Sequence, residues 1–167
     1  MSINYTTYES PLGTLTLYAT VSALVGLTFP TQSITFQEPV VIDETISSPI
    51  LRQTIQWLNQ YFHGQVPTMT IPLAPQGTNF QQRVWSQLQH IPYGTSLTYG
   101  ELSQRVFNSP IPKGSQAIGS AVGANPISII IPCHRVLGKG KALTGYTGGL
   151  SIKRALLSIE HIDFIDK

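Results

Sequence analysis

The chain has 167 residues, of which 41% are hydrophobic and 11% are charged, and its formal net charge is +2. This length and hydrophobic content exclude a disordered chain and allow one ordinary core or two small ones. The net charge permits contact with nucleic acid, but so few charged residues do not indicate a broad basic surface, and any affinity for nucleic acid should be modest. The N-terminus has the pattern of a strand rather than a signal sequence, and no run of about eighteen apolar residues occurs. We therefore expect a soluble protein of the cytoplasm that makes no contact with membranes.

The chain opens with three short runs rich in Tyr, Thr, Val and Leu, separated by turn residues. Such runs are typical of an antiparallel meander. The stretch from 30 to 47 that follows is polar and irregular. The three expected strands cover residues 3–10, 14–19 and 23–29.

A helix is expected after the meander, because Ser48 and Pro49 supply a helix cap and a first-turn proline before a helical apolar pattern. This helix should cover the sheet. Prolines and glycines between residues 63 and 78 interrupt every period and indicate a linker. We therefore expect a first domain at residues 1–75, which includes the linker from about 63, and a second at 76–167.

Capping boxes mark the first two helices of the second domain, at Thr78 with Gln81 and at Thr98 with Glu101. After a proline-rich connection, a further helix should run from Ser115 to about residue 124. Two short helices joined by a turn suggest a helix-turn-helix, although this connection is longer than usual.

The remainder of the second domain is expected to contain a strand, a wing and a closing helix. The apolar run at residues 129–131 predicts the strand, the basic turn at 139–141 resembles a wing, and the last helix should begin at Ser151. The expected fold class is therefore α+β. A small N-terminal antiparallel sheet with a covering helix precedes a mainly helical, winged helix-turn-helix domain.

The one cysteine of the chain, Cys133, follows Pro132 at the end of the apolar run. A structural cysteine is more often surrounded by apolar neighbours within an element, so this position favours a reactive thiol over an inert one. Adjacent His134 and Arg135 would favour the nucleophilic thiolate. A single cysteine also excludes an intramolecular disulfide and a cysteine-cluster metal site, so we expect no metal.

Several spaced motifs around Cys133 resemble the active-site domain of O6-alkylguanine-DNA alkyltransferases, also called methylated-DNA-protein-cysteine methyltransferases. The resemblance covers roughly residues 78–167, whereas the first 75 residues match only in style. It implies single, irreversible transfer of an alkyl group from O6 of guanine, and also from O4 of thymine, to the cysteine without a cofactor. The motifs are Asn125-Pro126, the run from Pro132 to Val136, the run from Gly145 to Gly149, Lys153, Leu156-Leu157 and Glu160.

The resemblance also implies roles for individual residues. Glu160 would hold His134, which would act as a base on Cys133 through a water molecule. Asn125 would brace the turn that leads to the active site, and Arg135 is expected mainly to pair with a carboxylate. Tyr99 would assist base flipping and donate a hydrogen bond to guanine N3. The pocket would be lined by Val122, Tyr146, Thr147 and Gly148.

The helix from Ser115 consists almost entirely of small residues, which either permit tight packing or let a partner approach its backbone closely. In the resembling family this helix enters the DNA minor groove, which implies double-stranded DNA carrying O6-alkylguanine as partner, bound with little sequence preference. We expect a monomer, and cooperative binding along DNA stays open. The expected DNA-contacting residues are Thr98, Lys113, Gln116, Ala117, Gly119, Ser120, Gly123 and Arg135.

Gln116 departs from the family pattern, because an arginine normally stands there and enters the base stack in place of the flipped nucleotide. Lys113 is the nearest cation that could compensate. Two alternatives therefore stay open. One is a non-enzymatic or poorly active lesion sensor on the same fold, and the other is a Cys-His hydrolase or acyltransferase, for which no oxyanion motif is evident.

Overall fold

The computed structural model describes residues 2–166, which divide into two compact units. The first unit extends to Gln76 and also includes Pro126–Ser128. The second unit contains Gly77–Asn125 and the chain from Ile129 onward. Among the described residues, no helix combines the length and the apolar character needed to cross a bilayer.

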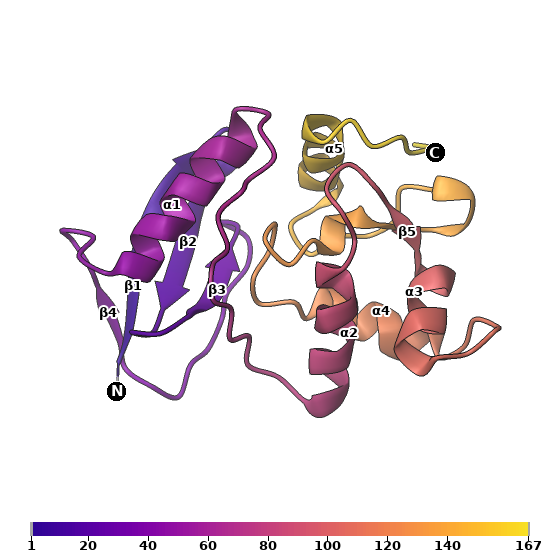
Figure 1. Ribbon diagram of the computed structural model, residues 1–167, viewed down its shortest axis with the longest axis horizontal. Helices are drawn as coiled ribbons and strands as arrows, with labels where there is room; N and C mark the ends of the chain where they lie inside the picture. The colour runs from indigo at the N-terminus through magenta and orange to yellow at the C-terminus, as the bar shows by residue number, and fades with distance from the viewer. Residues whose placement is uncertain (1, 167) are drawn as a thin grey trace. The chain divides into compact units, whose positions relative to one another are not determined.

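The sheet of the first unit has four strands in the order β3-β2-β1-β4 (Figure 1). Strands β1 (Ile3–Ser10), β2 (Gly13–Ala19) and β3 (Leu24–Thr28) form the expected antiparallel meander. Strand β4 (Val40–Ile42) instead pairs parallel with β1. The expectation of a wholly irregular segment before the helix is wrong here. The strand consists of three β-branched residues, a run too short to distinguish a strand from a loop by its pattern.

Helix α1 (Pro49–Phe62) covers this sheet, and its apolar face packs on β1, β2 and β3 (Figure 1). The Ser48 hydroxyl accepts a hydrogen bond from the Leu51 amide at 3.2 Å, as the predicted cap requires. The helix buries Ile50, Leu51, Thr54, Leu58 and Tyr61.

Three residues from the second half of the chain belong to the first unit. The Leu27 amide donates to the Pro126 carbonyl at 3.0 Å, and the Ser128 amide donates to the Leu27 carbonyl at 3.1 Å. The Ser128 hydroxyl also lies 3.3 Å from Oε1 of Gln32. This short segment therefore extends the edge of β3, although in sequence it lies between the helix that begins at Ser115 and Cys133.

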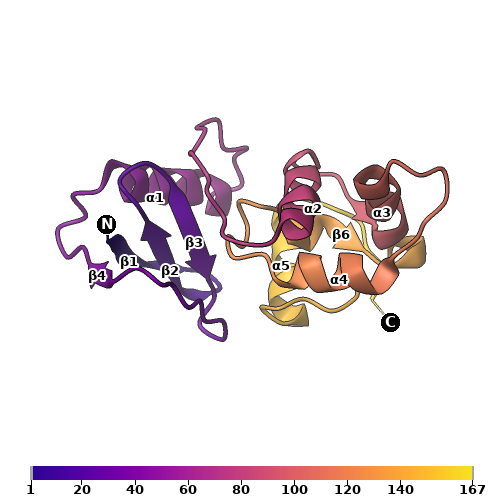
Figure 2. The same cartoon turned by 90° about the horizontal axis from the view of Figure 1, so that it is seen from below.

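The second unit is built around three helices that pack against one another (Figure 2). Helices α2 (Asn79–Gln89) and α3 (Tyr99–Phe107) begin at the two predicted capping boxes, which are both fully formed. Helix α4 (Ser115–Gly123) follows after a proline-rich connection. The helix-turn-helix pair expected from the sequence is thus α3 and α4.

Left-handed backbone at both ends of the connection sets the turn between α3 and α4. Asn108 ends α3 with φ 49°, and Gly114 precedes α4 with φ 64°. A Cβ atom at Gly114 would lie 2.8 Å from the Phe107 ring. Glycine is therefore required at this position for both space and backbone conformation.

The region around Cys133 differs from the expected strand and wing. Residues 129–131 form a turn, in which Ile129 has φ 71° and is fully buried, so the predicted strand there is wrong. A run of three apolar residues does not distinguish a strand from a buried turn. The strand β6 (Val136–Leu137) comes later and pairs parallel with β5 (Leu97–Thr98). The expected wing is a short 3-10 turn, Lys139–Lys141.

Helix α5 (Leu150–Ile159) closes the second unit and begins one residue before the expected Ser151. Leu157 of this helix packs with Leu137 and Ile162 in a small apolar cluster. The helix therefore fixes the position of Glu160, which directly follows its last residue.

Candidate active site

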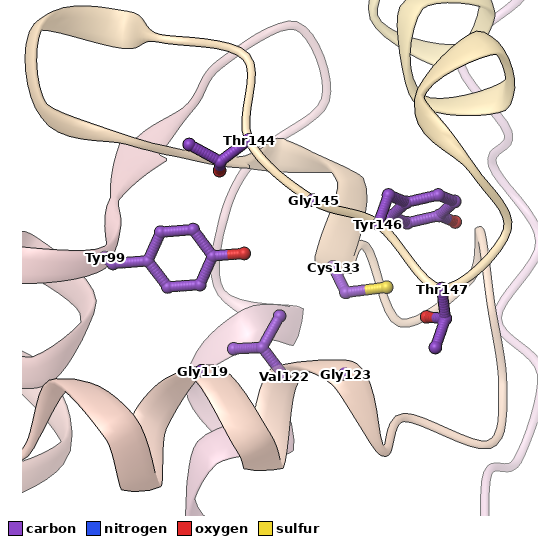
Figure 3. Close-up of a pocket in the computed structure, with 9 residues that line it drawn as sticks. All are labelled: Tyr99, Gly119, Val122, Gly123, Cys133, Thr144, Gly145, Tyr146 and Thr147. Atoms are coloured by element: carbon purple, nitrogen blue, oxygen red, sulfur yellow. The ribbon is translucent and has the colours of Figure 1, made fainter.

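Cys133 lines a pocket of about 320 Å³ in the second unit (Figure 3). It is the first residue of a 3-10 turn (Cys133–Arg135), and it is 2% exposed. The walls come from the start of α3, from α4 and from the loop that precedes α5. The lining residues are Tyr99, Gly119, Val122, Gly123, Cys133, Thr144, Gly145, Tyr146 and Thr147.

Burial dominates the acidity of the thiol and raises the pKa of Cys133. Interactions with the side chains of Asn125 and Tyr146 and the positive charge of Lys153 lower that pKa, but they do not outweigh burial. The resting sulfur is therefore a protonated thiol near neutral pH, and a nearby base must accept its proton before it can act as a nucleophile.

A histidine and a carboxylate lie next to the thiol in the chain and in space. His134 Nε2 is 2.5 Å from Glu160 Oε2, and both side chains are fully buried. Burial raises the pKa of Glu160, but hydrogen bonds and charge from His134 and Arg135 outweigh this effect and hold it at about 2. Burial lowers the pKa of His134. Because the carboxylate can only accept, Nε2 carries the imidazole hydrogen and Nδ1 is the basic nitrogen.

Arg135 is held inside the protein by the same carboxylate. Its Nε donates to Glu160 Oε1 and its Nη1 to the Ile91 carbonyl, both at 2.7 Å, and its side chain is 9% exposed. This agrees with pairing to a carboxylate. It removes Arg135 from the expected DNA contacts, because the buried ion pair keeps the guanidinium off the surface. Arg135 is also not the cation that lowers the pKa of Cys133.

That cation is Lys153, to which the sequence analysis gave no role. Lys153 is fully buried, and its Nζ donates to the carbonyls of Val136 at 2.6 Å and Thr144 at 3.2 Å. Burial lowers its pKa to about 8. A sequence signal was available, because Lys153 shares the apolar face of α5 with Leu156 and Leu157, three and four residues later. A lysine on an apolar helix face is expected to be buried, and its ammonium then needs hydrogen-bond partners inside the protein.

Tyr99 and the loop before α5 complete the pocket. Tyr99 is the first residue of α3, and burial raises the pKa of its phenol. Thr144 and Gly145 line the pocket although the sequence analysis did not select them, whereas Gly148 is not among the lining residues. In Figure 3 the side chains of Tyr99 and Thr144 lie on one side of the pocket, and those of Tyr146 and Thr147 lie on the other.

Asn125 joins the end of α4 to the turn before Cys133. Its side-chain amide donates to the Ile131 carbonyl at 2.8 Å, and Asn125 is 5% exposed. Val122, one turn earlier on α4, is buried and contributes to the pocket wall. The structure therefore brings Asn125, Val122 and the thiol together, and the functions expected of Asn125 and Val122 stay predictions.

The two glycines of α4 that line the pocket are not required for packing inside the protein. An added Cβ would meet no atom within 4 Å at Gly119 or at Gly123. The opposite face of the helix is the packed one, where Ala121 accepts a hydrogen bond from Trp85 Nε1 at 2.8 Å and Ile118 is fully buried. Tight packing does not explain these two glycines, so the open space beside them is available to a partner.

The other expected DNA-contacting residues lie around this open surface or cap a neighbouring helix. Gln116, Ala117 and Ser120 are exposed on α4. Lys113 is exposed too, with its Nζ 5.3 Å from the centre of the Phe107 ring. The Thr98 hydroxyl accepts from the Glu101 amide at 3.1 Å and caps α3. Their contacts with DNA stay predictions.

These features define a cysteine-based group-transfer site on a helix-turn-helix domain. Comparisons with known proteins identify the family. The model of the 6-O-methylguanine DNA methyltransferase DNA-binding domain matches residues 79–162, and that of its ribonuclease-like domain matches residues 3–75. The chain belongs to the 6-O-methylguanine DNA methyltransferase family.

Similar proteins match over nearly the whole chain. The methylated-DNA–protein-cysteine methyltransferase of Haemophilus influenzae is 42% identical over 167 residues, covering 99% of this chain and 90% of that protein. The constitutive enzyme of Bacillus subtilis is 39% identical and covers 98% of both chains. The crystal structure of Mycobacterium tuberculosis OGT in complex with DNA has a TM-score of 0.83 at 39% identity, covering 94% of this chain and 92% of that chain.

Proposed function

We propose that this protein repairs alkylated DNA by transferring the alkyl group from O6 of guanine to Sγ of Cys133. The observation that carries the proposal is the position of the only cysteine, at the wall of a pocket that also adjoins two unpacked glycines of α4. The names of the similar proteins, which describe methyl transfer from DNA to a protein cysteine, support it.

The transfer can be written with the residues present. The Cys133 proton passes through water to His134 Nδ1, and the thiolate attacks the alkyl carbon in line with its bond to O6. The S–C bond forms as the C–O6 bond breaks, and the electron pair of that bond remains on guanine. Glu160 stabilises the imidazolium that forms, as the carboxylate does in other histidine-based triads.

Tyr99 supplies the proton that the departing guanine requires. As C–O6 breaks, the phenol proton moves to guanine N3, which leaves guanine neutral and Tyr99 as a phenolate. The proton on the His134 imidazolium then passes through water to the Tyr99 phenolate, so the protein ends with a thioether at Cys133 and both His134 and Tyr99 neutral. A positive charge close by, on Lys153, favours both transient anions at Cys133 and Tyr99.

The target base must leave the duplex before it can reach a buried thiol. Unstacking costs a few kcal/mol, which contacts in the pocket must offset. The pocket volume of about 320 Å³ suits a single base. Val122, Tyr146 and Thr147 form its walls, and O4-alkylthymine presents the same kind of alkyl oxygen and is proposed as a second substrate.

Each molecule acts once, because a thioether at Cys133 has no tendency to release its alkyl group. The DNA surface is proposed to be α4, with its exposed small residues in the minor groove and little preference for sequence. A monomer is sufficient for this reaction, since all of the groups invoked belong to one unit of one chain. Gln116 would fill the stack as a neutral side chain.

The proposal is tested by titrating duplex DNA that carries O6-methylguanine or O4-methylthymine with the protein and measuring the lesion that remains by nucleoside chromatography. We expect loss of O6-methylguanine to stop at one lesion per protein molecule. Continued conversion beyond one equivalent contradicts single transfer. Repeated hydrolysis of a small ester in place of lesion loss would assign the Cys-His pair to a hydrolase.

A further inference from the structure

Thr144 lies between three groups of the site. It lines the pocket with Tyr99 and Cys133, and its backbone carbonyl accepts a hydrogen bond from Lys153 Nζ at 3.2 Å. Its hydroxyl oxygen is buried and makes no hydrogen bond to any residue that the structure describes, although part of the residue is exposed. Neither the family motifs nor the reaction described above assigns a function to this hydroxyl.

Packing fixes the direction of the Thr144 side chain. Its methyl group occupies the space over Gly138, where an added Cβ would lie 2.6 Å from Thr144 Cγ2. With the methyl group held there and the carbonyl held by Lys153, the hydroxyl is directed to the side of the pocket where Tyr99 lies (Figure 3).

We propose that Thr144 is a positioning residue for Tyr99, donating its hydroxyl hydrogen to the phenol oxygen so that the phenol proton points to the departing base. This inference rests on the proposed function of Tyr99 as proton donor. During transfer the Tyr99 O–H bond breaks and the proton moves to guanine N3. Thr144 keeps its own proton and stabilises the phenolate that remains.

The charges around Tyr99 agree with this role. Burial raises the pKa of Tyr99, and the interaction with the Thr144 side chain lowers it, which offsets part of that effect. Lys153 Nζ lies 6.0 Å from the centre of the Tyr99 ring and is held by the carbonyl of the same threonine. Thr144 therefore contributes to phenolate stability both through its hydroxyl and by placing the ammonium.

The test compares Thr144→Val, which keeps the methyl group over Gly138 and removes the hydroxyl, with Thr144→Ser, which keeps the hydroxyl. Valine should slow methyl transfer to Cys133 about tenfold, the effect of one lost hydrogen bond, and serine should retain most of the rate. In a Tyr99→Phe background the valine substitution should have no further effect. Equal loss in both variants, or the same loss without the phenol, overturns the proposal.

A second readout does not depend on methyl transfer. The pKa of Tyr99, measured by NMR with ring-labelled tyrosine, should rise in Thr144→Val and stay near the wild-type value in Thr144→Ser. An unchanged pKa in the valine variant overturns the contact itself. If the pKa rises but wild-type protein transfers no methyl group, the contact stands and the proposed function fails.

Discussion

Lys153 is a lysine whose side chain is removed from water. Its ammonium is fully buried, and its pKa of about 8 in the folded protein lies well below the ordinary value of 10.5. The unfolded chain therefore binds more protons between these values, so this group makes the free energy of unfolding rise with pH from about 8 to about 10.5. Below pH 8 the cost of the buried charge is fully present.

We therefore expect Lys153→Met to flatten that part of the stability profile. The difference between wild type and variant should change by about 3 kcal/mol across this pH range, since one pKa unit corresponds to about 1.4 kcal/mol. Urea unfolding at several pH values measures the slope. A variant with the same slope as wild type would show that Lys153 is not titrating in the folded state.

Glu160 is expected to act on the thiol rather than on DNA. Glu160→Gln leaves His134 without its carboxylate, so the imidazolium formed during transfer loses its stabilising charge. The reaction should slow about a hundredfold, both with duplex DNA and with a free-base benzylguanine analogue that needs no flipping. Quenched time courses of Cys133 alkylation with each substrate measure this effect.

Asp166→Asn provides the matched control for Glu160. Asp166 is also a carboxylate paired with an arginine, Arg154, but both side chains are over 40% exposed. Its loss should leave both rates unchanged, because an exposed ion pair contributes little. A Glu160→Gln defect confined to duplex DNA would instead assign the buried network to DNA handling.

At the scale of an element, the glycines of helix α4 should lower the stability of the protein and favour its binding to DNA. Gly119 lies within the helix and faces open space, so Gly119→Ala should raise the free energy of unfolding by about 0.5–1 kcal/mol. The same methyl group should weaken binding to duplex DNA, because it occupies the space that the partner needs. Denaturation and a fluorescence binding titration measure the two effects.

Gly77→Ala is the control, because it should change the free energy of unfolding in the direction opposite to Gly119→Ala. A Cβ there would lie 2.4 Å from the Trp85 ring, so this substitution should destabilise the protein while leaving the exposed residues of α4 unchanged. If Gly119→Ala also lowers stability, tight packing explains the glycine after all. If Gly119→Ala leaves the affinity for duplex DNA unchanged, α4 is not the DNA-binding surface.

Gln116 tests the role of the same helix in base flipping. It is exposed near the start of α4, where the family resemblance implies an arginine. Gln116→Arg should speed repair of duplex O6-methylguanine about tenfold, equivalent to about 1.4 kcal/mol at the barrier, and leave the free-base reaction unchanged. The gain should shrink at high salt, where attraction to phosphate is screened.

Gln65→Arg adds the same charge at an exposed position of the first unit and is the control for net charge. It should leave both rates near wild type. Equal acceleration by the two substitutions would mean that charge alone matters. Acceleration of both substrates, or of neither, by Gln116→Arg would mean that Gln116 does not replace the missing arginine and that Lys113 or another residue fills the stack.

The elements that the sequence specified locally were predicted well, and those set by tertiary packing were not. Helices α2 and α3 begin where Thr78 and Thr98 cap them, because a capping box is formed by residues three apart in the chain. The apolar run at residues 129–131 became a buried turn. A short apolar run can form either a strand or a buried turn, and only packing against the surrounding core determines which one forms.

The same distinction applies to the site. The linear motif around Cys133 led directly to the thiol, to His134 and, with the resemblance, to Glu160. The contributions of Lys153 and Thr144 depend on backbone carbonyl partners and on a fixed rotamer, which residue types alone do not reveal. The expected surface role of Arg135 failed for the same reason, because burial is a property of the folded chain.

At the scale of the whole molecule, the two units are not separated by a single boundary in the sequence. Residues 126–128 pair with Leu27 and belong to the first unit, although Asn125 and Ile129 on either side belong to the second. A prediction of two consecutive domains cannot contain such an excursion, because composition and punctuation reveal linkers but not pairing partners. The path from α4 to Cys133 therefore includes a segment that the first unit anchors.

The central claim is that Cys133 receives the alkyl group. It is tested most directly by intact mass and peptide mapping of the protein after mixing with duplex DNA that carries O6-methylguanine. The account predicts a gain of one methyl group, on the peptide that contains Cys133, in at most equimolar amount. Cys133→Ser should gain none while still binding DNA. Methylation of another residue, or lesion removal that leaves the protein mass unchanged, would contradict it.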